Sequence, residues 1–444
     1  MSRGVVALLA AIALIRPAQA GHGEASGELP KRPEPVLELG NDFLGQGAVT
    51  GGIMLPTGAV WQPTLLVFGT LRTALQTYDV ATGRPSGAVR TEAEWANRLD
   101  LFVNLSLTGT ERILLGFRPL DDAGGFSGYD FGAPGDDAWR GHGSARIETL
   151  FFEGDFGELF PRLDGGDRRP LDLGLAIGRQ PLFFQEGLLL ADSVDAFGVT
   201  RNTLRPADTS NVRVTGIVGW GDVDRDGGDD DRVRLAGLFT ELDDERSTYD
   251  VDLVLVHSPR GGTSVHAGVS AVQRWGTVNT AVRWLSSAPF DDDGGAGRGS
   301  LLFGELSWTP RGGHDLAYVN GFVAFDQFTP AARDRALGGP LARTGILFEG
   351  AGLGRAATAL DASAHDAVGL AVGYQKLIDD GRSQLVAELG LRHDTGGHDT
   401  AAAAGVRFQR AIGRRTLVRA DGFASWAEAS RARYGGRLEL LIKF

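Results

Sequence analysis

The sequence ends in Tyr434-Gly-Gly-Arg-Leu-Glu-Leu-Leu-Ile-Lys-Phe444, and this stretch decides the fold class. Every second residue falls on one face, which carries Tyr434, Gly436, Leu438, Leu440, Ile442 and Phe444. The opposite face carries Arg437, Glu439 and Lys443 and is interrupted only by Leu441. Alternation with a period of two predicts a β-strand with one apolar and one polar face.

A strand of this kind that ends in an aromatic residue resembles the closing strand of a bacterial outer-membrane β-barrel. The resemblance implies that Phe444 is bound by the barrel assembly machinery and that the apolar face contacts outer-membrane lipid and lipopolysaccharide. An edge strand of a soluble protein can alternate in the same way, so the rest of the chain must agree. In that case the apolar face would line a sandwich core instead of facing lipid.

The beginning of the chain predicts export from the cytoplasm. Residues 1–20 combine Arg3, an apolar run from Val5 to Ile15 and the cleavage motif Ala18-Gln19-Ala20. This is the pattern of a secretory signal peptide, and the run is too short for a membrane-spanning helix. We expect residues 21–60 to be a periplasmic segment or a lead-in to the first strand, and residues 61–444 to form the barrel.

Composition narrows the class further. There is no cysteine, which excludes disulfides and thiolate metal sites, and 65 glycines suit a sheet with many tight turns. The net charge is −12, or −14 without Arg3 and Arg16 of the signal peptide, and this acidic balance disfavours nucleic acid as a partner. No phosphate loop, zinc pair or nucleophile elbow is present, so we expect neither an enzyme nor a cofactor.

Alternating runs recur along the chain from Trp61 onward. In the run from Trp95 to Leu107, Leu99, Leu101 and Val103 share one face, while polar residues occupy the other. About 18 such runs have the length that a tilted strand needs to cross a bilayer. The connections alternate roughly between short and long, and the long ones are 121–143, 221–232, 289–299 and 327–366. The sequence therefore predicts an all-β protein, a transmembrane antiparallel β-barrel with long external loops and short periplasmic turns.

The stretch from Leu171 to Arg201 supplies a second resemblance. A strand ends in Gly178-Arg179-Gln180, an apolar loop follows from Pro181 to Leu190, and a strand with Asp192, Asp195 and Arg201 returns. This pattern resembles the alginate-export family of outer-membrane porins, although Phe183 and Gln185-Glu186 depart from the usual Tyr-Gly-type continuation. The resemblance implies an 18-stranded barrel whose lumen is rich in arginine and acidic residues. We expect the loop 181–190 to constrict the lumen, the alternative being an ordinary external loop.

The alternation also predicts which charges face the lumen. The inward arginines are those at positions 98, 112, 118, 146, 213, 234, 283, 392, 407, 419 and 437, and the inward acids are Asp100, Glu148, Asp250, Asp252, Glu305, Glu388, Asp421 and Glu439. Guanidinium groups bind carboxylate or phosphate with two hydrogen bonds, so the excess of arginine indicates a path for anions. The alternative is a ladder of structural ion pairs. The candidate pore residues are Arg179, Arg213, Arg283, Arg98, Arg118, Arg146, Asp100, Glu148, Glu186 and Glu305.

One external loop carries closely spaced carboxylates. Its candidate metal ligands are Asp222, Asp224, Asp226, Asp229 and Asp230. Alternate carboxylates followed by glycine can converge on one hard cation, which predicts a structural calcium ion. The helical calcium-loop pattern is incomplete, because its twelfth position is Val233. A solvated acidic loop is the alternative.

Together these patterns predict an outer-membrane porin for the passive transport of a small anionic or saccharide-like solute. A general or phosphate-type porin with 16 strands is one alternative. An outer-membrane barrel enzyme, or a purely structural barrel, is the alternative from another class.

Overall fold

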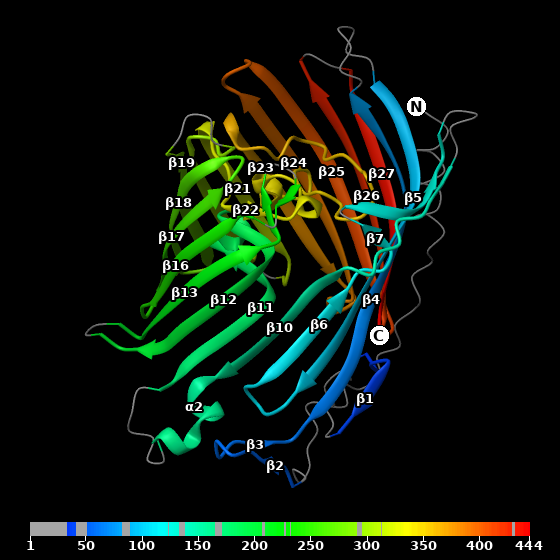
Figure 1. Cartoon of the computed structure of the whole chain (residues 1–444). Helices are drawn as coiled ribbons and strands as arrows, with labels where there is room; N and C mark the ends of the chain where they lie inside the picture. Colours follow the sequence, from blue (N-terminus) through cyan, green and yellow to red (C-terminus); the bar gives the residue numbers. More distant parts are fainter. Residues whose placement is uncertain are drawn as a thin grey trace.

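The chain forms a closed antiparallel β-barrel, as the computed structural model in Figure 1 shows. The structure describes residues 33–40, 51–81, 89–122, 124–132, 138–164, 171–206, 209–225, 228–230, 232–290, 295–311, 313–428 and 431–444. The predicted signal peptide and Asp226 lie outside these residues. None of the described helices is long and apolar enough to cross a membrane.

Within these residues, eighteen strands make the barrel wall. They are β4 (Thr64–Ala81), β5 (Val89–Ser106), β6 (Arg112–Phe117), β10 (Ile147–Asp155), β11 (Leu173–Phe184), β12 (Leu190–Leu204), β13 (Asn211–Gly221), β16 (Arg234–Asp243), β17 (Ser247–Ser258), β18 (Gly262–Trp275), β19 (Val278–Pro289), β20 (Gly299–Trp308), β21 (Leu316–Gln327), β23 (His365–Ile378), β24 (Ser383–Asp394), β25 (Asp399–Ile412), β26 (Thr416–Ala427) and β27 (Arg433–Lys443). The predicted fold class and strand number are confirmed, and the alternative of 16 strands is wrong.

The barrel closes where β27 pairs with β4. Leu438 lies opposite Leu75, and the pairing runs on to Lys443. Phe444 continues it, because its backbone N–H donates to the carbonyl of Gly69 at 3.1 Å and its carbonyl accepts from the Gly69 N–H at 2.7 Å. The C-terminal stretch from Tyr434 to Phe444 therefore forms the seam of the barrel. Below the seam the short strand β1 (Leu37–Leu39) pairs with the same edge of β4.

Strand β17 shows why the sequence forms a wall with two different faces. Along it, exposed and buried residues alternate: Leu253 is 52% exposed, whereas Val254 on the next position is fully buried. The outward residues Val251, Leu253 and Leu255 are all apolar and exposed. Soluble proteins do not leave such a continuous apolar surface in water, whereas a transmembrane barrel presents it to lipid.

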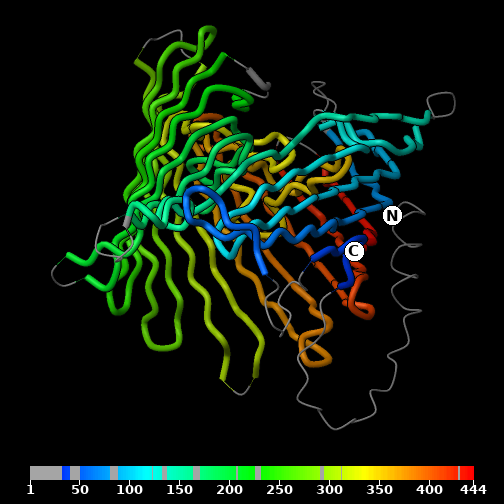
Figure 2. Tube along the Cα trace, turned by 60° about the horizontal axis from the view of Figure 1, so that its bottom comes forward, coloured from blue at the N-terminus to red at the C-terminus, as the bar shows by residue number. Residues whose placement is uncertain are grey.

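The end of the barrel that holds Phe444 carries mostly short turns, as expected for the periplasmic side (Figure 2). The connection between β10 and β11 is the exception and contains α2 (Phe156–Leu159) and η1 (Pro161–Asp164). It contacts the lead-in hairpin of β2 (Ile53–Met54) and β3 (Val60–Trp61), since Arg162 Nη1 donates to the Pro56 carbonyl at 2.7 Å.

The connections that start at the opposite end carry small elements of their own. These are β7 (Asp121–Asp122), β8 (Gly125–Asp130), β9 (Ala138–Arg140), η2 (Gln185–Gly187), β14 (Val223–Arg225), β15 (Gly228–Asp230), β22 (Ala332–Arg333), η3 (Arg335–Leu337) and η4 (Pro340–Arg343). Strand β8 pairs with the upper part of β5, so the wall continues beyond β6 on this side.

The prediction that residues 327–366 form an external loop is wrong in its placement. The segment 328–364, here called the inner loop, starts and ends at the external side but lies inside the barrel (Figure 1). Its apolar residues Leu341, Leu347, Phe348 and Leu360 are buried in one cluster with inward residues of the wall such as Phe303. Burial of apolar surface therefore draws the loop into the lumen.

Candidate functional site

The inner loop sends an arm across the lumen. The backbone N–H of Leu360 donates to the carbonyl of Leu347 at 3.0 Å, so residues 348–359 form a loop with a closed base, here called the crossing arm. At the base, Phe348 packs against Phe322 of β21 with ring centroids 5.7 Å apart. At the tip, Leu353 is fully buried in a separate cluster with wall residues of β4 and β5. The arm therefore joins two distant parts of the wall.

Wall arginines hold the backbone of the crossing arm. Arg72 of β4 donates from Nη2 to the carbonyl of Ala351 at 3.0 Å and from Nη1 to that of Gly352 at 3.2 Å. Arg98 of β5 donates to the same Gly352 carbonyl at 3.3 Å. Because these donors are charged, each bond contributes more than a neutral hydrogen bond would.

The far side of the arm is fixed by acids. Arg355 donates from its backbone N–H to Glu94 Oε1 at 2.6 Å and from Nη2 to Asp130 Oδ1 at 2.7 Å. Burial alone would lower the pKa of Arg355, but Asp130 raises it above its ordinary value. Gly354 has a φ of +71°, and a Cβ there would lie 2.1 Å from Nε2 of Gln76. Only glycine allows the arm to approach the wall so closely.

The base of the arm rests on a buried carboxylate. Glu388 of β24 accepts from the backbone N–H groups of Ile346 at 3.0 Å and Leu347 at 2.9 Å, and from the hydroxyl of Tyr318. Beside it, Arg392 donates to the carbonyl of Ser363 at 2.7 Å. Glu388 and Arg392 were predicted as inward charges, and here they anchor the inner loop.

Four predicted pore residues meet in one charged cluster near the external side. Arg118 lies 3.2 Å from Asp100, 3.6 Å from Glu148 and 3.7 Å from Asp334 of the inner loop, and Arg98 lies 2.9 Å from Asp100. Burial alone would lower the pKa of Arg118, but Asp334, Glu148 and Asp100 together raise it above its usual value. A cavity of about 50 Å³ opens between Arg118, Glu148 and Asp334.

The same cluster extends to the first aspartate of the predicted calcium loop. Arg146 Nη2 lies 2.6 Å from Asp222, and Arg146 Nε lies 3.8 Å from Glu148. Arg179 Nη1 lies 2.9 Å from the same aspartate. Asp222 thus has two guanidinium partners. No group of three acidic or histidine side chains converges as a metal site among the described residues. Calcium binding stays a prediction.

Arg179 does not stand at a constriction. It shares its strand face with Ile177 and Phe183, which are exposed, and its Nε lies 3.0 Å from Asp195. Gly178 has a φ of +120°, and a Cβ there would lie 2.2 Å from the Leu150 carbonyl oxygen. The pleat is therefore distorted at this point, yet the side chain remains on the outward phase, where it pairs with acids.

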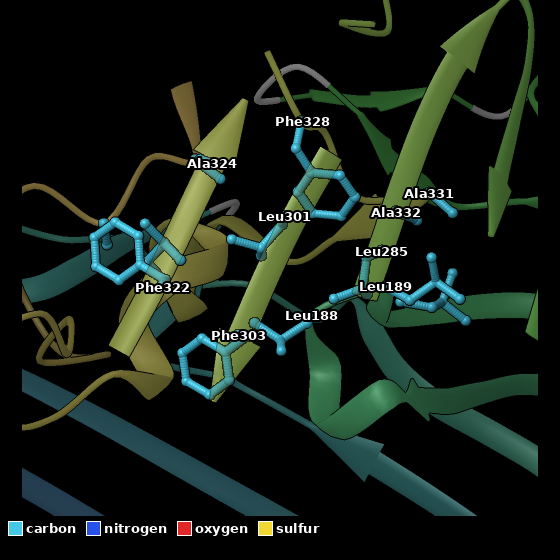
Figure 3. Packing of buried hydrophobic residues seen from close by; sticks show 14 of the residues in the cluster. Leu188, Leu189, Leu285, Leu301, Phe303, Phe322, Ala324, Phe328, Ala331 and Ala332 are labelled. Atoms are coloured by element: carbon cyan, nitrogen blue, oxygen red, sulfur yellow. The ribbon is translucent and has the colours of Figure 1, made fainter. Parts of the chain in front are cut away.

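The predicted constriction 181–190 is corrected in part. Pro181 to Phe184 continue strand β11, because they pair with residues of β12. The remainder turns inward: Leu188 and Leu189 are fully buried in the apolar cluster (Figure 3), and Gln185 Nε2 donates to Asp252 at 2.8 Å. The inner loop, which was expected outside the barrel, lies in the lumen as well.

A second charged chain links the wall to both inward segments. Arg283 of β19 is only 3% exposed and pairs with Glu305 of β20. Arg343 of the inner loop lies 3.3 Å from Glu305 and 2.9 Å from Glu186. The predicted residues Arg283, Glu305 and Glu186 are thus brought together by an arginine that the prediction missed. Arg213 lies apart and pairs with Glu241 at 2.6 Å.

The inner loop also meets the segment 185–189 directly. Arg333 donates from Nη1 to the carbonyl of Gly187 at 2.7 Å and from Nε to that of Gly338 at 2.7 Å. Burial lowers the pKa of Arg333 to about 10, an effect that neighbouring Asp334 opposes. At neutral pH the guanidinium stays charged, so it can hold both backbone segments.

Beyond the apolar cluster, which reaches Ala403 of β25, the wall of β25, β26, β27 and β4 is rich in arginine. Asp421 lies 2.8 Å from Arg407 and 3.7 Å from Arg437. Glu439 pairs with both Arg72 and Arg437. Two wall carboxylates therefore serve three arginines.

Arg419 is a fourth arginine on this wall, and no acidic partner is found for it among the residues that the structure describes. The strand register places it opposite Glu439, whose oxygens are already engaged by other arginines. Its Nε atom is buried and lacks a hydrogen-bond partner within the same residues. These four residues are here called the arginine wall: Arg72, Arg407, Arg419 and Arg437. The two wall carboxylates do not compensate all of their positive charge.

Comparison with solved structures identifies the architecture. OpdK of Pseudomonas aeruginosa, solved with vanillate, matches with a TM-score of 0.55 and 12% identity over 86% of this chain and 98% of OpdK. OpdG (OccK9) of the same organism matches with a TM-score of 0.54 and 14% identity over 86% of this chain and 98% of OpdG.

Wzi of Escherichia coli, an outer-membrane protein involved in group 1 capsule assembly and a carbohydrate-binding β-barrel, matches with a TM-score of 0.50 and 11% identity, covering 84% of each chain. No protein-family model matches this chain, and no curated protein matches it in sequence. At these identities the likeness shows the fold, that of an outer-membrane β-barrel, in agreement with the predicted localisation.

Proposed function

We propose that this barrel is an outer-membrane channel for the passive diffusion of small anionic solutes. The observation that carries the proposal is Arg419, a lumen cation for which no acidic partner is found among the described residues. Fixed positive charge beside a narrow passage attracts anions and repels cations. The structurally similar OpdK was solved with vanillate, an aromatic carboxylate, which is consistent with a carboxylate as solute.

A uronic acid is a suitable first solute for this channel. The resemblance of residues 171–201 to alginate-export porins implies a polymer of uronic acids, and the similar barrel Wzi binds carbohydrate. A sugar carboxylate offers one group for the arginine wall and hydroxyl groups for the surrounding carbonyls. That the solute is alginate is a more specific prediction, which rests on this resemblance alone.

Arg419→Gln should move the reversal potential in planar bilayers toward cations at about 0.1 M salt, where charges are screened over about 10 Å. The matched control is Arg260→Gln in the external turn between β17 and β18, where the side chain is exposed. The control should leave the potential unchanged. A parent channel that prefers cations would refute the proposal, and so would an unmoved potential in folded Arg419→Gln protein.

A structural barrel without transport is the alternative that the many lumen ion pairs favour. In that case the crossing arm would close the passage, and the parent protein would show no channel events in the bilayer. Electrophoretic heat modifiability must first show that the inserted protein is folded.

A further inference from the structure

We propose that Glu349 of the crossing arm is an internal counter-ion that competes with solute anions for the arginine wall. This inference rests on the proposed function and names how the same site is regulated. A carboxylate of the solute would take the place that the Glu349 carboxylate holds, so the strength of this internal ion pair sets how tightly the channel holds its solute.

The position of Glu349 supports this role. It is the one carboxylate of the arm, whose sequence from Phe348 to Ala359 is FEGAGLGRAATA. Its Oε2 lies 2.6 Å from Nη1 of Arg407, and its side chain is 42% exposed, whereas that of Arg407 is 14% exposed. The carboxylate therefore covers a cation from the open side, the side from which a solute would approach.

Arg407 can exchange one partner and keep the other. Its Nε donates to Asp421 at 2.8 Å, and this aspartate is fixed in the wall by the pairing of β25 with β26. The other half of the guanidinium faces Glu349, which belongs to the arm. A guanidinium can bind two carboxylates at once, so the group on the arm can be replaced without loss of the wall contact.

There is space next to this pair. A cavity of about 70 Å³ is bordered by Glu349, Arg407, Asp421 and Arg437 together with the arm residues 351 and 356–359. This is well above the roughly 10–15 Å³ that a single water needs, so the cavity has room for water or for a group of carboxylate size. Part of the solute could enter while the rest of it stays in the open lumen.

The charge balance gives the direction of the effect. Four arginines of the wall face Asp421, Glu439 and Glu349, which leaves one positive charge in excess. Replacement of Glu349 by glutamine keeps the shape but raises the excess to two. The variant should therefore prefer anions more strongly and hold a carboxylate solute longer.

The test uses the full-length protein in planar bilayers with sodium glucuronate as the probe. Glu349→Gln should move the reversal potential further toward anions and lower the glucuronate concentration that half-blocks the current by several-fold. Addition of Arg407→Gln to the same chain should cancel both gains, because the guanidinium that Glu349 pairs with is then gone.

The matched control is Asp361→Asn, which removes another inner-loop carboxylate that pairs with a wall arginine. Asp361 lies 3.3 Å from Arg392, whose side chain is nearly buried and also bonded to backbone carbonyls, so its loss opens no cation to the lumen. An equal shift in this control would overturn the inference. If the parent channel prefers anions but Glu349→Gln changes neither the reversal potential nor the glucuronate block, only this inference is overturned. If the parent channel prefers cations, the proposed function is overturned as well.

Discussion

Replacement of residues 349–357 by two glycines should raise the single-channel conductance several-fold. The segment crosses the lumen, and its base is already closed by the hydrogen bond between Leu360 and Leu347. A short linker can therefore span the gap without moving the apolar cluster that contains Phe348 and Leu360. Current through a pore rises as its open section widens, and the arm crosses the lumen from β21 to the wall of β4 and β5.

The change should also expose wall charges of both signs, because it removes Glu349 and Arg355 together. In the parent protein Arg72 and Arg98 donate hydrogen bonds to the carbonyl of Gly352. Without the arm, these donors would bind water and solute. Replacement of the external turn at residues 395–398 by two residues is the control, since that turn only joins β24 to β25. Equal conductance in the parent and in a folded arm variant would mean that the arm does not limit the passage.

The barrel could be predicted from sequence because its signal is local and repeated. In strands such as β17, successive side chains point alternately to lipid and to the lumen. The pattern therefore predicts both the strand and which of its residues face the lumen. The same rule found Arg98, Asp100, Arg118 and Glu148, which the structure indeed brings together. It could also have found Arg72 on β4, which the sequence argument overlooked.

The inner loop could not be predicted in the same way. Residues 328–364 have no period of two, and a long connection between strands reads as external by default. Its position depends on apolar residues such as Leu341 and Phe348, whose wall partners lie far away in sequence. The charged residues that it carries, Arg343, Glu349 and Arg355, were therefore missed.

Arg179 shows a different limit. The sequence pattern predicts that a strand ends in Gly178-Arg179-Gln180, and the backbone at Gly178 does have a positive φ. The strand nevertheless continues to Phe184, so the side chain keeps the outward phase. One glycine distorts a strand without ending it when the neighbouring strand continues to pair.

The lumen has two sides of different chemistry, and this division explains why single charges can matter there. The inner loop packs its apolar residues against wall residues from β11 to β25, and its crossing arm contacts Arg72, Arg407 and Arg437 of the arginine wall. A solute that passes beside the arm would meet Arg407 and Arg419 in a setting with less water than bulk. Electrostatic interactions are stronger there than at an exposed surface.

Leu253→Arg should destabilise the barrel in lipid by about 2–4 kcal/mol, the cost of an arginine at the bilayer midplane. Leu253 lies midway along β17 and points outward with more than half of its surface exposed. Tyr249→Arg on the same face is the matched control, because it lies near the periplasmic end of the same strand. There the side chain reaches the interface and the cost falls to about 0–1 kcal/mol.

Unfolding by urea in lipid vesicles measures both free energies. The difference between the two positions is the diagnostic quantity, because in water both substitutions would replace an exposed apolar residue at little cost. Equal and small losses at Leu253 and Tyr249 would contradict a lipid-facing surface and return the soluble sandwich to consideration. A loss that grows toward the middle of β17 would locate the bilayer on the barrel and, with it, the depth at which the crossing arm meets the arginine wall.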